Sequence, residues 1–212
     1  PWGGSPVGLN TSNLIGGYDN STGINQIAYT WQFGNGISAQ VGIEDNRVIN
    51  RAPIFNGAVA STATNFSTGA YTNAAGGNVS PDFVGNIRVD QAAFTAQLSA
   101  GLHNIHAGYY GTTEPTGHPS DAWGFAIAGG IQLKNLPTGP GDKMSLQATS
   151  TDGAPKYVIG GTTGNNFDAF NNSGTSSPAF YQTFASLALF DGVYTTNGSI
   201  EKTKVWGFRG GY

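Results

Sequence analysis

The chain has 212 residues, a formal net charge of −3, no cysteine, and a charged fraction of only 10%. Soluble globular domains carry roughly 25% charged residues, so this composition argues against an ordinary soluble domain. The lack of cysteine excludes disulfides and thiol chemistry, and the lack of a dense Lys/Arg cluster argues against a nucleic-acid partner.

Alternation of apolar and polar residues predicts strands along most of the chain. From Gln26 to Phe33 the bulky apolar side chains stand at odd positions, and successive side chains on a strand point to opposite faces. The same pattern recurs after Gly36 and after Ala93. Together with turn signals, it predicts strands near 24–33, 37–47, 82–90, 93–110, 122–134, 142–152, 180–191 and 201–212.

No run approaches the roughly 18 apolar residues of a membrane helix, so any membrane crossing must use strands. Strands with one apolar and one polar face suit a barrel that has lipid outside and water inside. The predicted fold class is therefore an all-β, antiparallel transmembrane β-barrel, of which about eight strands are visible.

Short and long connections alternate between the predicted strands. Gly34-Asn35-Gly36, Gln91-Ala92 and 135–141 are short, whereas 48–81 and 153–179 are long. Outer-membrane barrels have short periplasmic turns and longer external loops. We therefore expect the long connections, with 111–121 among them, to be extracellular.

Six parts of the chain match one known family: Ile27 to Gly36 with Glu44-Asp45, Pro81 to Ala92, Ala100 to His103, His118 to Gly124, Pro140 to Asp142, and Leu146 to Thr149. They resemble the general porins of alphaproteobacterial outer membranes. The resemblance implies a barrel of about sixteen strands that assembles as a homotrimer and passes small hydrophilic solutes and ions by diffusion. It also implies outer-membrane lipid and lipopolysaccharide as surroundings, and no cofactor.

About eight strands close only a narrow barrel filled by side chains, whereas a porin is water-filled. We therefore expect residues 1–212 to be an internal piece of a longer porin, all within one barrel domain. By resemblance, residues 1–22 form a constriction loop that folds into the lumen, with Asp19 as its only carboxylate, and 24–212 supply strands and loops.

Strand parity places five charged or titratable residues on the water-facing side, because an Arg on the lipid side would cost roughly 2 to 4 kcal/mol near the midplane. Charges across a narrow pore bias the passage of ions. Arg88 and Asp90 point the same way, and the residues leave open whether they set selectivity or form a salt bridge in the wall. The predicted pore-lining residues are Glu44, Arg88, Asp90, His103 and Arg209.

Catalytic and metal sites are disfavoured. His103 and His106 are three apart, which places them on opposite faces of a strand, and no cysteine completes a ligand set. Ser99 and His103 are too far apart along a strand to act as nucleophile and base, and no hydrolase motif occurs. A non-enzymatic diffusion channel is the first hypothesis, and a secreted β-rich adhesin or lectin-like binding module is the alternative.

Overall fold

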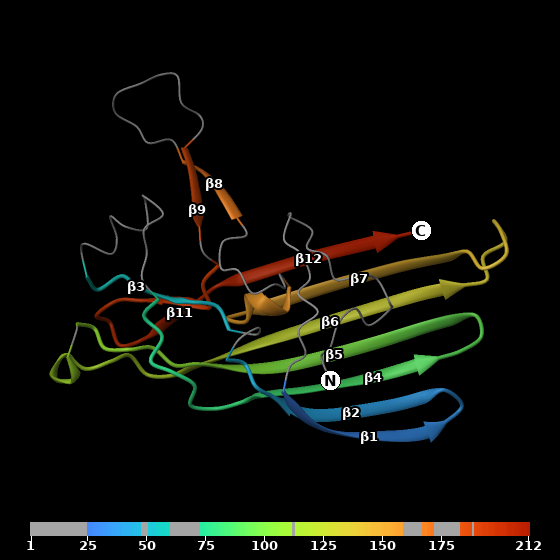
Figure 1. The fold of residues 1–212 in the computed structure, drawn as a ribbon, viewed down its shortest axis with the longest axis horizontal. Coiled ribbons are helices and arrows are strands. Elements are labelled where there is room, and N and C mark those ends of the chain that lie inside the picture. Colours follow the sequence, from blue (N-terminus) through green and yellow to red (C-terminus); the bar gives the residue numbers. More distant parts are fainter. Residues whose placement is uncertain are drawn as a thin grey trace.

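The main element is a seven-stranded antiparallel sheet with the order β1-β2-β4-β5-β6-β7-β12 (Figure 1). The computed structural model describes residues 25–47, 51–59, 73–111, 113–158, 167–171, 183–187 and 189–212. Most neighbours in the sheet are neighbours in the chain, but β12 returns from a distant part of the sequence to pair with β7. The strands are β1 (Gln26–Gly34), β2 (Ile37–Glu44), β4 (Asp82–Asp90), β5 (Phe94–Ile105), β6 (Ala122–Lys134), β7 (Lys143–Asp152) and β12 (Lys204–Gly211).

Two smaller sheets form in the long connections. β3 (Ile54–Asn56) runs parallel to β10 (Gly192–Tyr194), which pairs with β11 (Ile200–Lys202). β8 (Phe167–Asn171) pairs with β9 (Thr183–Leu187). Figure 1 shows β3 and β11 beyond one end of the large sheet, at the left, whereas its short turns lie at the right.

Two short 3-10 turns, η1 (Glu114–Thr116) and η2 (Pro155–Tyr157), also lie in the connections. Within the described ranges, no helix is long and apolar enough to cross a membrane.

The predicted antiparallel all-β class is confirmed, but several strand boundaries were wrong. The strand predicted at 93–110 ends at Ile105, which pairs with the first residue of β6, because the chain then leaves the large sheet. The strand predicted at 201–212 divides at Thr203 into β11 and β12, which belong to different sheets. β3 and β8 lie inside segments that were expected to be loops, since strands this short leave little alternation to detect.

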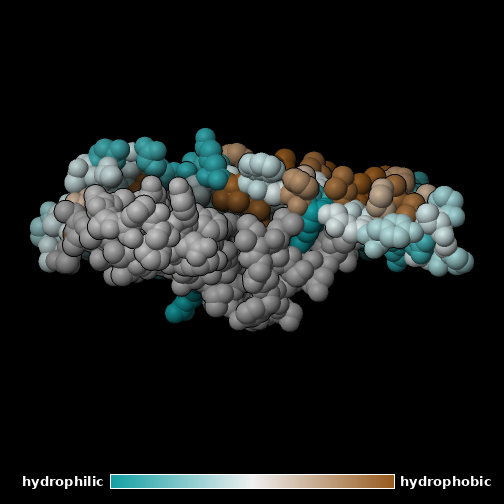
Figure 2. Space-filling model, turned by 90° about the horizontal axis from the view of Figure 1, so that it is seen from above, coloured by the Kyte–Doolittle hydropathy of each residue, from teal (hydrophilic) through white to brown (hydrophobic). Residues whose placement is uncertain are grey.

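The register of the large sheet separates its two faces. Ile43, Phe83, Leu102 and Phe125 stand opposite one another on four consecutive strands, on the same face. This apolar face is exposed, with 54% of Leu98 accessible, and Figure 2 shows the hydrophobic side chains gathered along one side of the molecule. An apolar surface of this extent on a sheet is suited to lipid rather than water.

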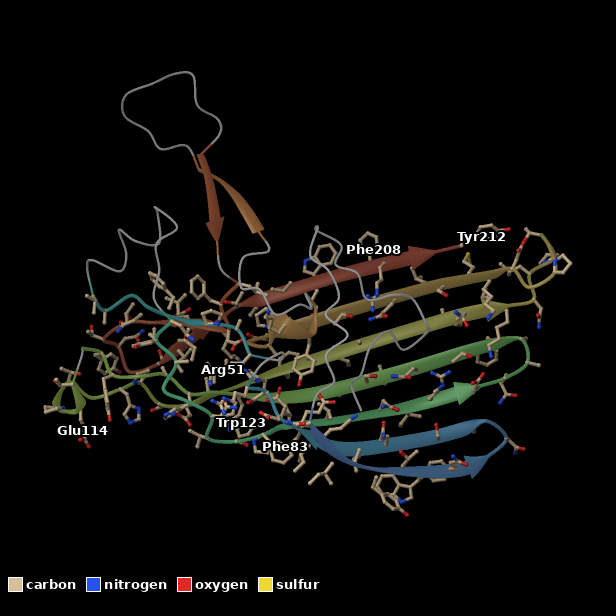
Figure 3. All side chains as sticks on the ribbon, viewed as in Figure 1. Arg51, Phe83, Glu114, Trp123, Phe208 and Tyr212 are labelled. Atoms are coloured by element: carbon tan, nitrogen blue, oxygen red, sulfur yellow. The ribbon has the colours of Figure 1, made fainter. Side chains whose placement is uncertain are left out.

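Aromatic side chains stand on the apolar face near the strand ends. Figure 3 shows Phe83 beside Trp123, with ring centroids 6.1 Å apart, and Phe208 along β12, where it stacks on Trp206. Such rings are stable at a bilayer interface.

A glycine-rich turn joins β1 and β2. Gly34, Asn35 and Gly36 have φ angles of 83°, 49° and 72°, in the left-handed region that glycine and asparagine adopt most easily. Asp90 N–H donates to the Gly36 carbonyl over 2.8 Å, and a Cβ on Gly36 would collide with the Asp90 carbonyl oxygen. The predicted tight turn is therefore confirmed, and its last glycine allows β4 to approach.

The buried apolar residues gather where the long connections meet the large sheet. One cluster joins Ile105, at the end of β5, to Ile54, Tyr194 and Ile200 of the three-stranded sheet. A second cluster packs Tyr157 of η2 against Val84 and Ala126 on the polar side of the large sheet. These clusters attach the long connections to the sheet end opposite the short turns.

Candidate functional site: the polar face of the sheet

One lateral row of polar residues crosses all seven strands at the same depth. We call it the arginine row, because it carries Arg88 on β4 and Arg209 on β12. Strands lie about 4.8 Å apart, so four strand steps separate these arginines by roughly 19 Å. The row consists of Gln32, Ser38, Arg88, Gln97, Gly130, Gln147 and Arg209.

The two arginines differ in their partners. Arg209 donates from Nε and Nη2 to Oε1 of Gln147, its neighbour in the row, over 3.3 and 2.8 Å. Arg88 forms an ion pair with Asp90 over 3.3 Å. The salt bridge considered from the sequence is therefore present, and a part in ion selectivity stays a prediction for both arginines.

A second cation shares the carboxylate of Asp90. Lys134, the last residue of β6, donates from Nζ to Oδ1 of Asp90 over 2.5 Å, and the Thr95 hydroxyl donates to the same oxygen over 2.8 Å. Sequence reasoning missed Lys134, although the alternation along 122–134 puts it on the polar face. Two cations therefore face one carboxylate near the short turns.

The row of Gln26, Glu44, Asp82 and His103 lies at the opposite end of the polar face. Parity predicted this face for Glu44 and His103, but both are buried, with 2% and 0% exposed. His103 Nδ1 lies 2.7 Å from Oδ1 of Asp82, and Nε2 lies 3.2 Å from Oδ2 of Asp191. The connecting segments thus cover these side chains, and their assignment to a pore lining stays a prediction.

Further hydrogen bonds extend this cluster into the loops. The Tyr157 hydroxyl donates to Oδ2 of Asp82 over 2.5 Å, and the Asn46 amide donates to Oδ1 over 2.6 Å. The Ala52 N–H donates to Oδ2 of Asp191 over 2.9 Å. We call Asn46, Asp82, His103, Tyr157 and Asp191 the buried histidine network.

Burial shifts the pKa values of loop residues in and beside this network. It raises the pKa of the Asp191 carboxyl, against the hydrogen bond from His103 that lowers it. Burial also lowers the pKa of the Lys156 ammonium, against the attraction of Asp191. Buried charges are tolerated where they are paired, so the network holds these loops in one arrangement.

Small residues on the polar face make room for η2. A Cβ on Gly101 would lie 3.7 Å from Cζ of Tyr157 and 3.5 Å from Val84. Ala126, opposite Gly101 on β6, is buried in the same cluster as Tyr157. The segment that follows β7 therefore folds over the polar face of the sheet. Sequence reasoning missed this contact, although the run of small residues was visible.

Asp19 and the predicted constriction loop 1–22 lie outside the described residues. In the part of the chain that is described, no three His, Cys, Asp or Glu side chains are placed to hold a metal ion. His106 instead contacts Asp121, with Nδ1 and Oδ1 2.7 Å apart.

A family model described as the Porin subfamily matches residues 3–208. The chain belongs to this porin subfamily. No curated protein and no solved structure matches the chain. Membership confirms the resemblance to alphaproteobacterial porins and decides for the channel over the secreted binding module. This porin is an outer-membrane protein that passes small hydrophilic solutes by diffusion and is not an enzyme.

Proposed function

We propose that the polar face of the seven-stranded sheet lines the water-filled lumen of this porin, with the arginine row, Asp90 and Lys134 supplying its charges. The observation that carries the proposal is the register, which gathers polar side chains on one face and exposed apolar ones on the other. Fixed charges beside a narrow water column bias the passage of ions without binding a substrate tightly.

The ends of the sheet suggest an orientation. Short turns gather at one end and the long connections at the other (Figure 1), as in outer-membrane barrels whose longer loops are external. We propose that the long connections, including 111–121, are extracellular. The inward-folded segment that carries Tyr157 would then stand near the outer mouth, and residues 1–22 with Asp19 would narrow the lumen as the resemblance implies.

The assembly proposed is a homotrimer in outer-membrane lipid and lipopolysaccharide. Trimers are typical of porins, and the exposed apolar face offers a surface for both lipid and neighbouring subunits. Residues 1–212 would all belong to one barrel domain of each subunit.

The test is single-channel recording of the detergent-purified native protein in a planar bilayer, together with its intact mass. Conductance steps in groups of three, with a mass about twice the 21.9 kDa of this chain, would support a trimeric porin of which these residues are a piece. An absence of conductance from a protein that has inserted into the bilayer would contradict the proposed lumen.

A further inference from the structure

The polar face carries a hollow of about 300 Å³ across β1, β2, β4 and β5. Four carboxamides, two hydroxyls and one guanidinium line it, and the described residues that form it include no carboxylate. The carboxamides of Gln40 and Asn86 contact each other over 3.3 Å, and Gln97 donates to Ser99 over 2.9 Å. The lining is therefore ordered by hydrogen bonds and rich in N–H and O–H donors.

Arg88 supplies the charge of this hollow. Its side chain is 39% exposed, and its ion-pair partner Asp90 also accepts from Lys134 over 2.5 Å. Asp90 is thus shared between the guanidinium of Arg88 and the ammonium of Lys134. A guanidinium presents its donors as a planar fork that matches two oxygens of a carboxylate or phosphate.

Other side chains on the polar face near the hollow are also positively charged. Lys143 stands opposite Lys134 in the register, and Arg209 shares the arginine row with Arg88. In contrast, Glu44 and Asp82 on this face are buried at the far end. Among the described residues near the short turns, the four cations Arg88, Lys134, Lys143 and Arg209 outnumber the two carboxylates Asp90 and Asp142.

We propose that this hollow is a weak binding site for small oxyanions, such as inorganic phosphate or a short carboxylate, on their way through the channel. Arg88 binds the oxyanion, and the carboxamides and hydroxyls complete its hydrogen bonds. The site is open to solvent, so binding is weak enough to allow release, as permeation requires. This inference rests on the proposed function, because the hollow reaches solutes only if the polar face lines the lumen.

The test is a titration of the single-channel chloride current of the full native protein with inorganic phosphate. Millimolar phosphate should reduce the current, and Arg88→Gln should raise the half-blocking concentration at least fivefold. Arg209→Gln removes the same charge from the same row, roughly 19 Å away, and should change that concentration less than twofold. Arg88→Lys, which keeps the charge and loses the fork, should fall between the native protein and Arg88→Gln.

Equal effects of Arg88→Gln and Arg209→Gln would overturn the site, since phosphate would then sense only the overall charge. A conducting native channel that neither phosphate nor succinate blocks would also overturn it while leaving the proposed function intact. If Arg88→Gln fails to insert, Arg88→Met, which also removes the charge, takes its place in the comparison with Arg209→Gln. A parallel titration with succinate measures whether the hollow favours a carboxylate over phosphate, and block by either supports it.

Discussion

Two adjacent residues of β5 test the assignment of lipid and water to the faces of the sheet. Leu98 stands on the apolar face and is 54% exposed, whereas Gln97 points to the polar face, opposite Arg88. The same substitution, to arginine, at both positions places an identical charge on opposite faces at nearly the same depth. The two variants therefore control for each other.

The two substitutions should differ clearly in how far they lower the free energy of unfolding. Leu98 is the third of five apolar-face positions on β5, from Phe94 to Leu102, which places it near the middle of the apolar band. An arginine on the lipid face near the midplane costs about 2 to 4 kcal/mol. Gln97→Arg adds a charge about 5 Å from Arg88 in hydrated surroundings, where the repulsion is below about 1 kcal/mol.

The measurement is the free energy of unfolding in urea for protein folded into lipid vesicles, followed by tryptophan fluorescence. Leu98→Arg should lower it by about 2 to 4 kcal/mol, and Gln97→Arg by less than about 1 kcal/mol. A larger loss for Gln97→Arg, or equal losses for both, would refute the assignment of the faces.

Three further predictions concern single groups. Gly36→Ala should destabilise the fold by more than Gly34→Ala, since both glycines have positive φ but only Gly36 would meet the Asp90 carbonyl; urea unfolding midpoints compare them. Asp82→Asn removes one of two buried carboxylates beside the network histidine and should cost roughly 3 kcal/mol or more, with faster proteolysis of the covering loops. Burial raises the pKa of Tyr194 to about 12, so its stabilising contribution is complete below the unfolded pKa of about 10 and is lost as the pH rises through 12. Tyr194→Phe should therefore weaken the dependence of the unfolding midpoint on pH in this range. A pH dependence equal to that of the native protein would contradict this.

Alternation predicted the two faces of the large sheet because each face carries one kind of side chain, apolar or polar, over many positions. Gln97 and Leu98 could be assigned from parity alone, and the register confirms that they stand on opposite faces. The parallel pairing of Ile54 with Gly192 could not be predicted, since the two residues are far apart in the chain and β3 and β10 have only three residues each. Strands of that length carry no readable period.

The predictions for the candidate site divide in the same way, because local properties could be predicted from the sequence and long-range contacts could not. Parity placed Arg88 and His103 on the polar face, which is a local property of their strands. The burial of His103 depends on Asp191, which is 88 residues away in sequence, and on Tyr157 from a different loop. No spacing rule links these residues, so the sequence placed His103 on the polar face but could not show that loop residues bury it.

The connectivity of the molecule also implies an order of assembly. From β1 to β7 the strands of the large sheet pair in chain order, and only the long connection from β2 to β4 separates partners widely, so most of this part can form from local pairings with small loss of chain entropy. The buried histidine network closes only when Asp191 meets Asp82 and His103 across long stretches of chain. The large sheet is therefore expected to form before the loops that carry Tyr157 and Asp191 pack onto its polar face.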